Sequence, residues 1–377
     1  MTDIVIAAYR RSPFTLANKG ALTKMRPDDL AASVVRALVD GIDVSRIEDL
    51  IVGCAFPEGE QGLNVARLVG FIAGLPQSVA GTTVNRFCGS SMQAVHQAAG
   101  AIALGAGEAF ICAGVESMTR VPTMGFNPMP NPALAKAYPQ AYVSMGETAE
   151  NVAQRHQIGR AEQEAFAARS QAKAGAARAD GRLADEIVTV GPAGKQVTED
   201  GCIRPDTTPE SLATLKPAFR IDGTVTAGTS SPLTDGAAAV LVCTADYARA
   251  NGLTPLARVK SLAVSGCAPE VMGMGPVEAT RKVLARAGLT MRDIDVIELN
   301  EAFASQSIAC IRELGIDEAR LNLDGGAIAL GHPMGATGAR IVGKAAALLR
   351  RTGGRHALAT QCIGGGQGIA TVLEALS

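Results

Sequence analysis

The sequence has no tryptophan, few other aromatic residues and no long apolar run. Aromatic residues are 3 % of the 377 residues, which argues against surfaces that stack on nucleic-acid bases. The 35 lysines and arginines nearly balance the 36 aspartates and glutamates, and no basic run suggests nucleic acid as a partner. No apolar stretch approaches the ~18 residues needed to span a bilayer, so we expect no membrane insertion.

The eight cysteines form neither a disulfide framework nor a metal-binding pattern. None belongs to a C-x-x-C pair, and several lie in apolar runs, as Cys243 does at the end of AVLVC. Such a distribution is typical of free thiols in a reducing compartment, and the spacing does not suit structural zinc. The first residues, MTDIVIAA, have the character of a strand and lack the basic and apolar segments of an export signal. We therefore expect a cytoplasmic protein without a metal.

Two further cofactor patterns are absent or unconvincing. No G-x-G-x-x-G follows an expected strand, so a nicotinamide cofactor is not indicated. Residues 338–345, GARIVGKA, resemble a phosphate-binding loop, but they end in alanine where magnesium needs serine or threonine. They also lie within a helical pattern. We expect no permanently bound cofactor.

Apolar residues, in contrast, are abundant. They make up 47 % of the chain, while charged residues are 19 %, so a sizeable core is expected and disorder is not. The 42 glycines indicate many tight turns or close backbone approaches. The length suits two domains or one duplicated domain.

An α/β pattern occurs twice along the chain. A helix over 30–39 leads to a strand at 50–56, and a helix over 280–287 leads to a strand at 296–303. Each helix is preceded by a proline and each strand ends in Ala-Phe. In the first copy a strand at 83–85, a helix and a strand at 109–114 follow, with a buried strand at 236–242. Residues 321–324, a helix over 336–350 and a strand at 357–361 follow in the second.

This alternation predicts two similar α/β halves with a mostly parallel sheet covered on both faces. Between 119 and 224 the alternation is lost. Residues 121–139 are expected to be irregular and 146–179 helical, and such a long interruption is usually functional. We expect an amino-terminal half at 1–118 plus 225–250, an inserted domain at 119–224, and a carboxyl-terminal half at 251–377.

Cys88 stands where strand-like residues give way to an alanine-rich helical pattern. The positive end of a helix dipole favours a thiolate, so the sequence predicts a lowered pKa and a nucleophilic role for Cys88. Gly89 leaves the sulfur accessible to a substrate carbon. The alternative is a buried cysteine that only fills space.

Three more segments place polar groups near the ends of expected strands. His332, one of four histidines, lies among glycines before a helix, where it could act as a base or only satisfy a turn. Cys362 precedes a run of glycines whose N–H groups could bind an oxyanion. Asn300 could hold a water or an oxyanion, and Glu301 could be a structural partner for backbone donors. Parallel α/β sheets bind ligands at such strand ends.

Together these segments resemble the thiolase family over essentially the whole chain. The matching motifs are NRFCGSS at 85–91, NEAF at 300–303, GGAIALGHP at 325–333 and CIGGG at 362–366. The resemblance implies an α/β fold of duplicated βαβαβαββ halves, a layered α/β/α/β/α core and an inserted α/β loop domain. Residues 225–236, VTAGTSSPLTDG, resemble the degradative branch, which cleaves 3-ketoacyl-CoA thiolytically.

The resemblance also implies a role for each site residue. Cys88 is the acylated nucleophile, and His332 takes its proton and hydrogen-bonds a thioester oxygen. Cys362 is the acid and base that serves the acetyl-CoA enolate. Asn300 holds the water of one oxyanion hole, and the backbone N–H groups of Cys88 and Gly364 form the other.

In the family, coenzyme A is a co-substrate that lies along the inserted domain. Arg204 is expected near its adenine end. The positions that match its contacts are Arg204, Ser211, Phe219, Ala227, Ser231, Leu233, Met272 and Phe303. Phe219 and Leu233 could equally be plain core. The resemblance further implies a homodimer or homotetramer, acyl-CoA substrates and a multienzyme partner in fatty-acid β-oxidation.

One residue departs from the family pattern, and three alternative functions remain to be considered. Ser144 stands where the biosynthetic acetoacetyl-CoA branch has histidine, which argues against strict acetoacetyl specificity. That branch is nevertheless the first alternative. A carbon-chain-building synthase of the same architecture pairs one cysteine with two histidines, or with histidine and asparagine, so Cys362 argues against it. A non-catalytic acyl- or lipid-binding protein is disfavoured by intact Cys88, His332 and Cys362.

Overall fold

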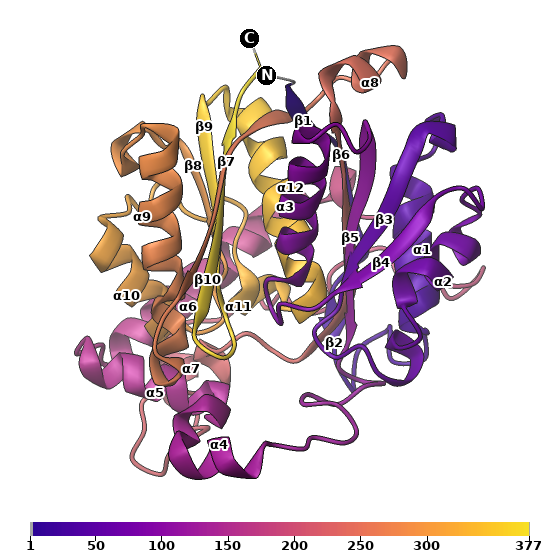
Figure 1. Ribbon diagram of the computed structural model, residues 1–377. Coiled ribbons are helices and arrows are strands. Elements are labelled where there is room, and N and C mark those ends of the chain that lie inside the picture. The colour runs from indigo at the N-terminus through magenta and orange to yellow at the C-terminus, as the bar shows by residue number, and fades with distance from the viewer. Residues whose placement is uncertain (1–2, 377) are drawn as a thin grey trace.

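Ten strands join in one sheet in the computed structural model, which describes residues 3–376 (Figure 1). The order is β4-β3-β5-β6-β1-β7-β10-β9-β8, and β2 pairs with β6 at the side. The strands are β1 Ile4–Arg11, β2 Thr15–Leu16, β3 Ile47–Gly53, β4 Ala80–Val84, β5 Ala109–Ser117, β6 Thr234–Thr244, β7 Ala257–Gly266, β8 Val296–Leu299, β9 His356–Ile363 and β10 Gln367–Glu374.

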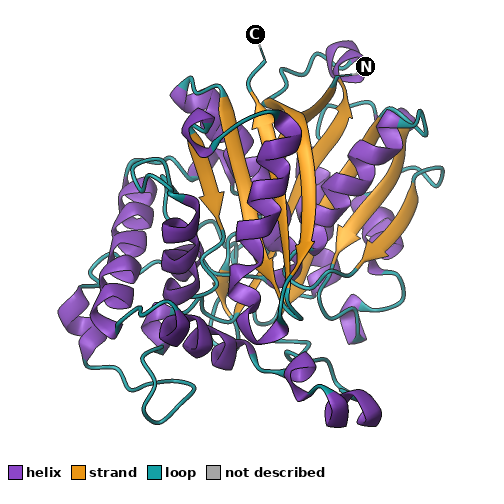
Figure 2. Ribbon diagram, turned by 60° about the vertical axis from the view of Figure 1, so that its left-hand side comes forward, coloured by secondary structure: helices purple, strands orange, loops and turns teal. Residues whose placement is uncertain are grey.

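Helices cover the strands on both sides (Figure 2). They are α1 Pro27–Leu38, α2 Val65–Ala73, α3 Ser90–Ala103, α4 Pro132–Ala137, α5 Met145–Arg155, α6 Arg160–Ala179, α7 Pro209–Ala213, α8 Ala245–Ala250, α9 Gly275–Ala287, α10 Ala304–Leu314, α11 Ala327–Leu330 and α12 Met334–Thr352. None of the helices within residues 3–376 combines the length and the apolar character needed to cross a bilayer.

The two halves of the sheet repeat one topology. In the first half the order is β4-β3-β5-β6-β1, and in the second β8-β9-β10-β7. In the second half, Leu321 takes the place of β4 and forms an isolated parallel bridge with Ile297 of β8. β1 and β7 join the halves through the antiparallel pairs of Val5 with Arg258 and Ile6 with Ala257. The predicted duplication is thus visible in the pairing of the strands.

The sheet is mixed, so the prediction of a mostly parallel sheet was wrong. Among the named strands of residues 3–376, β3 with β4, β3 with β5 and β8 with β9 pair in parallel, and the other pairs are antiparallel. β6 and β10 run against their neighbours on both sides. A helical crossover keeps two strands parallel, but β10 follows β9 through a tight turn, which reverses the chain. β6 follows the inserted segment and is also antiparallel to β5.

The middle layer consists of α3 and α12, which lie between the two halves of the sheet (Figure 1). Their apolar side chains share one core with both halves, including Met92 of α3, Ile341 of α12, Phe110 of β5 and Ala359 of β9. Gly338 permits the close contact of the helices, because a Cβ there would lie 2.2 Å from the backbone N of Met92. Residues 338–345 are therefore a buried packing surface of α12 and not a phosphate-binding loop.

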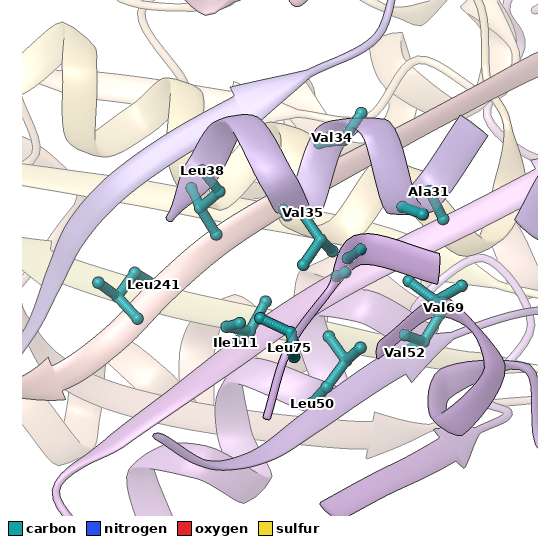
Figure 3. Close-up of a cluster of buried hydrophobic side chains, with 14 of the residues drawn as sticks. Ala31, Val34, Val35, Leu38, Leu50, Val52, Val69, Leu75, Ile111 and Leu241 are labelled. Carbon is teal, nitrogen blue, oxygen red and sulfur yellow. The ribbon is translucent and has the colours of Figure 1, made fainter. Parts of the chain in front are cut away.

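An outer core covers the far face of the first half. Val35 and Leu38 of α1 pack toward Leu50, Ile111 and Leu241 of three neighbouring strands (Figure 3). All five side chains are at most 3 % exposed. Burying each aliphatic side chain contributes roughly 1.5–3 kcal/mol. This face anchors the strands whose ends carry the site.

The segment 119–224 gathers at the lower end of the sheet (Figure 1). It holds α4, α5, α6 and α7, and its β structure consists of isolated bridges such as Val190 with Val197, so it is more helical than expected. The expected helix over 146–179 is two helices, because the chain turns at Gln157, whose φ is 52°. The irregular stretch 121–139 contains the short α4.

Candidate active site

Cys88 lies in a strained turn between β4 and α3. Phe87, just before it, has a φ of 43°, which is unfavourable for a side chain of this size. Two side chains hold the turn. Asn85 Oδ1 accepts the N–H of Phe87 at 2.8 Å, and Ser90 Oγ donates to the carbonyl of Phe87 at 2.6 Å. The turn presents Cys88 directly before Gly89, the residue that caps α3.

The thiol of Cys88 is less acidic than a free cysteine, so the predicted lowering of its pKa was wrong. Burial raises the pKa of Cys88 to about 11, although hydrogen bonds from the N–H groups of Gly364 and of Cys88 itself lower it. The buried carboxylate of Glu116 raises it further. The residue is 8 % exposed, and the loss of hydration outweighs the helix dipole.

His332 is neutral, and its hydrogen bonds determine which nitrogen carries the proton. Burial lowers the pKa of His332 to about 3, and the charge of Arg340 acts in the same direction. Nδ1 lies 2.6 Å from Thr337 Oγ1, whose hydroxyl donates to the carbonyl of Pro333 at 3.1 Å. The hydroxyl has one proton, so it accepts from Nδ1–H. Nε2 is therefore left with its lone pair and can act as a base.

Asn300 points its amide at the same imidazole nitrogen. Its Nδ2 lies 3.4 Å from His332 Nε2, and its backbone N–H donates to the carbonyl of Thr360 in β9 at 3.0 Å. Asn300 Oδ1 is buried and has no hydrogen-bond partner within residues 3–376. A buried amide oxygen without a partner is costly, which is consistent with a site for a polar ligand or a water.

Cys362 lies near the end of β9 and is a neighbour of Cys88. It is fully buried, and burial raises the pKa of Cys362 well above that of a free thiol, with a further contribution from the neighbouring Cys88. The side chain of the preceding residue, Gln361, donates from Nε2 to the carbonyl of Cys88. Gly364, two residues beyond Cys362, directs its N–H at the Cys88 sulfur. These contacts place Cys362 and Gly364 beside Cys88.

Contacts between the halves bring the amino-terminal ends of α3 and α12 together. Ser91 Oγ accepts the N–H of Ala339 at 2.8 Å. Glu116 Oε2 accepts the N–H of Gly335 in α12 at 2.9 Å and that of Ala55 at 2.8 Å. The sequence motifs did not single out Thr337, Gln361 or Glu116. The partners of Gln361 and Glu116 are distant in sequence, and Thr337 lies inside α12.

Glu301, in contrast, has the structural role that the sequence left open. Its carboxylate accepts from Ser170 Oγ at 2.6 Å, Asn322 Nδ2 at 2.8 Å and the N–H of Ile328 at 3.2 Å. These bonds hold the loop that leads to His332.

The expected contacts of coenzyme A form a partly exposed surface beside this site. The rings of Phe219 and Phe303 meet edge to face, 5.9 Å apart at 83°. The N–H of Ser231 donates to the carbonyl of Ala302 at 3.0 Å, next to Phe303. Met272 and Phe303 are buried with Cys362, whereas Phe219, Ala227 and Leu233 are exposed. These residues thus connect the surface to the buried thiols.

Three further positions have local partners. Ser211 Oγ donates to the carbonyl of Thr208 at 2.8 Å and completes a capping box of α7, so its hydroxyl is already used. Arg204 is exposed, and its N–H donates to Gln171 Oε1 at 2.7 Å. Ser144 caps α5 by accepting the N–H of Glu147 at 3.4 Å.

The prominent cavities lie away from the buried groups of the site. The most voluminous of three prominent cavities, about 810 Å³, lies between β1, α1 and the carboxyl-terminal half of α12, away from Cys88. Neither it nor the cavities of about 430 and 180 Å³ is lined by Cys88, His332 or Cys362. Phe87, which precedes Cys88, is 38 % exposed, whereas Cys88 is 8 % exposed.

A duplicated α/β fold with two neighbouring thiols and a neutral imidazole has the groups that an acyltransferase needs to work through a thioester. Family models for the thiolase amino-terminal and carboxyl-terminal domains match residues 4–246 and 253–375. The chain belongs to the thiolase family.

Relatives and solved structures agree with this assignment. The chain is 49 % identical to a 3-ketoacyl-CoA thiolase of Bacillus subtilis and 47 % identical to one of Aeromonas hydrophila, each covering 99 % of this chain and 100 % of the relative. The structure of human mitochondrial 3-ketoacyl-CoA thiolase in complex with CoA matches with a TM-score of 0.92 at 36 % identity, over 100 % of this chain and 98 % of that one.

Proposed function

We propose that this thiolase cleaves 3-ketoacyl-CoA with coenzyme A and yields acetyl-CoA and a shortened acyl-CoA. The observation that carries the proposal is the position of Cys362 as a neighbour of the buried Cys88, and the neutral His332, whose Nε2 carries no proton, supports it. Full-length relatives that are named 3-ketoacyl-CoA thiolase support the same substrate class. The reaction is reversible and runs backwards as a Claisen condensation.

The first half-reaction acylates Cys88. As Sγ attacks the 3-keto carbon, His332 Nε2 takes the thiol proton, which requires the neutral imidazole that the structure has. The bond between the keto carbon and the acetyl-CoA carbon then breaks, and its electron pair forms the acetyl-CoA enolate. The Cys362 thiol protonates the enolate carbon and is left as a thiolate.

The second half-reaction transfers the acyl group to coenzyme A. The Cys362 thiolate takes the proton of the incoming CoA thiol, whose sulfur attacks the thioester of Cys88. Collapse of the tetrahedral adduct expels the Cys88 sulfur, which recovers its proton from His332. Both halves pass through a thioester, so the exchange costs little free energy.

Two groups of donors stabilise the charged oxygens. The N–H groups of Cys88 and Gly364 already point at the Cys88 sulfur and bind the oxyanion formed on the adjacent carbon. His332 Nε2, once protonated, and a water held by Asn300 bind the enolate oxygen. Removing one such donor typically costs about 3–4 kcal/mol of transition-state stabilisation.

Coenzyme A is the co-substrate, and the surface formed by Phe219, Ala227, Ser231 and Leu233 leads from the exterior to Phe303 and Met272. Arg204 is exposed and offers a cation to the nucleotide end of coenzyme A. Ser211 contributes indirectly to this binding surface, because its hydroxyl caps α7. Serine in place of histidine at position 144 removes one expected contact with short acyl groups, next to Met145, which packs against Cys362 and its cluster. We therefore expect 3-ketoacyl-CoA longer than acetoacetyl-CoA to be preferred, which kcat/KM over a ladder of chain lengths measures.

Mass spectrometry of the protein after addition of 3-ketoacyl-CoA without free CoA tests the proposal. We expect one acyl adduct on the peptide that contains Cys88. In Cys362→Ala we expect acyl-CoA still to acylate Cys88, while cleavage of 3-ketoacyl-CoA stops because the enolate receives no proton. A folded wild-type protein without an adduct on Cys88 would rule out the mechanism.

The same family relationship supports a homodimer or homotetramer and a partner enzyme of fatty-acid β-oxidation. The eight free cysteines are consistent with the expected cytoplasmic location. Light scattering coupled to gel filtration separates the two oligomers from a monomer.

A further inference from the structure

The turn that carries the Gly364 N–H lacks side chains of its own. Residues 364–366 are three successive glycines, and Gly365 and Gly366 have φ values of 79° and 82°. Glycine has more backbone freedom than any other residue, so such a turn does not define the direction of an N–H group by itself. An oxyanion donor, however, must point at the developing charge to within a fraction of an ångström.

The side chain of Gln367, the next residue, holds this turn. Its Nε2 donates to the carbonyl of Gly364 at 3.3 Å. Its Oε1 accepts from Arg86 Nη1 at 3.0 Å. A single amide therefore connects the turn of the second half to a residue of the first half that is 281 positions away in sequence.

Arg86 is held in turn by α3 and belongs to the turn that presents the nucleophile. Its Nε donates to Gln93 Oε1 at 2.9 Å, and its backbone N–H donates to Ser90 Oγ at 2.9 Å. Arg86 and Cys88 are two residues apart and joined by a parallel bridge. The chain of bonds from Gln93 through Arg86 and Gln367 ends at Gly364, whose N–H bonds to the Cys88 sulfur.

We propose that Arg86 and Gln367 are positioning residues, which set the direction of the Gly364 N–H relative to Cys88 and so complete the oxyanion hole. The inference rests on the proposed function, because it assigns the N–H of Gly364 to the acyl oxyanion. Neither residue touches the reacting atoms. Their effect on the reaction passes entirely through the backbone of Gly364.

A second hydrogen bond nearby provides a control. It allows positioning of the Gly364 N–H to be distinguished from a general stabilising contact between α3 and β10. His96 of α3 and Thr371 of β10 are joined at 2.9 Å between Nε2 and Oγ1. This bond connects α3 to β10, whereas the Arg86–Gln367 bond connects the turn before α3 to β10. It lies four residues further along β10 and does not contact the glycine turn. Thr371→Val is therefore the matched control.

The experiment compares Gln367→Met, Gln367→Glu, Arg86→Met and the double Met variant with the control, all in the full-length protein. The rate of Cys88 acylation by acyl-CoA is followed by quenched-flow mass spectrometry, together with KM for CoA and the melting temperature. In Gln367→Met we expect acylation to slow about 10–100-fold, while KM changes less than about threefold. Gln367→Glu keeps the acceptor for Arg86 but loses the donor to Gly364, so its rate of Cys88 acylation should fall by a similar factor.

Arg86 and Gln367 act through one chain of bonds, so their effects should not add. We expect the double variant to acylate within about twofold of the slower single variant. Thr371→Val should acylate at the wild-type rate, whatever its melting temperature.

Wild-type acylation in Gln367→Met, additive losses, or an equal loss in Thr371→Val would overturn the inference. A wild-type protein that forms no adduct on Cys88 would instead overturn the proposed function on which the inference rests.

Discussion

Cys88 and His332 are an uncharged pair in the resting protein. Burial raises the pKa of Cys88 to about 11 and lowers the pKa of His332 to about 3, because each charged form loses hydration. Between these values the thiol keeps its proton and the imidazole stays neutral. Proton transfer therefore accompanies attack on the substrate, and the resting site contains no reactive thiolate.

This pair of pKa values predicts how alkylation of Cys88 by iodoacetamide depends on pH. Since the thiolate is the reactive form, the rate should keep rising up to about pH 10 without levelling off. A free cysteine, used as the reference thiol, levels off above its pKa of about 8.5. Modification followed by mass spectrometry of the Cys88 peptide measures the profile. Levelling of the Cys88 rate below about pH 9 would contradict the prediction.

Thr337 determines the tautomer of His332, so removing its hydroxyl should slow acylation. In Thr337→Val, Nδ1–H loses its acceptor and the proton can move to Nε2, where it blocks the base. We expect acylation of Cys88 to fall about 10²-fold with little change in KM for CoA. Thr337→Ser keeps the hydroxyl and should restore most of the rate. If the serine variant is as slow as the valine variant, the tautomer is not the cause.

Among the elements, the end of β5 and the start of α12 matter most for the site. Glu116, near the end of β5, accepts from the N–H groups of Ala55, Phe56 and Gly335 at 2.8, 3.2 and 2.9 Å. One carboxylate therefore joins the loop after β3 to the first turn of α12. The same turn carries Thr337, so Glu116 supports His332 indirectly.

Replacing Glu116 with glutamine should destabilise the protein, because an NH₂ group would then face backbone donors. We expect the free energy of unfolding in urea to fall by about 2–3 kcal/mol. The control is Glu60→Gln, in a partly exposed pair with Arg120, which should cost no more than about 1 kcal/mol. Equal losses in the two variants would show that Glu116 has no special role.

For the whole molecule, buried ion pairs connect the two halves and the inserted segment. Lys344 Nζ lies 2.7 Å from Asp324 and 2.9 Å from Glu186, which also pairs with Arg11 of β1 at 2.7 Å. Asp324 also pairs with Arg351 at 2.6 Å. Each buried charge has a partner of opposite sign. Removal of one partner therefore leaves the other charge buried and unpaired.

The network predicts how stability depends on pH. Burial alone would raise the pKa of Asp324, but the hydrogen bond from Arg351 and the charge of Lys344 outweigh it and hold the pKa at about 2. An unfolded aspartate has a pKa of about 3.9, so this stabilisation is present above about pH 4 and is lost as the pH falls toward about 2. Asp324→Asn should thus lower the free energy of unfolding at pH 7 by about 2–3 kcal/mol.

The difference between wild type and Asp324→Asn should shrink as unfolding is measured at pH 4 and then at pH 3. Asp246→Asn is the control, since its pair with Arg249 is more than three-quarters exposed on both sides. It should have little effect at any pH. A loss in Asp324→Asn that is constant with pH would show that the charge of Asp324 does not act as described.

The repeat and the four motifs are local patterns, and for that reason they could be predicted. Helices and strands follow from the spacing of apolar residues, so the duplicated α/β halves and the family were evident before the coordinates. The meeting of Cys88, Asn300, His332 and Cys362 was predicted because their segments were expected near strand ends. The structure places Asn300 beside His332 and Cys362 near Cys88. The domain limits and the role of each residue stay predictions.

Other properties depend on neighbours that the sequence does not show. The direction of β6 and β10, the raised pKa of Cys88, the tautomer of His332 and the link from Arg86 to Gly364 each depend on residues far apart in the chain. Burial, and with it the cost of a charge, exists only after the two halves pack. The sequence by itself determined which groups this thiolase carries, and the tertiary structure decided their protonation and direction, since both depend on distances that only packing sets.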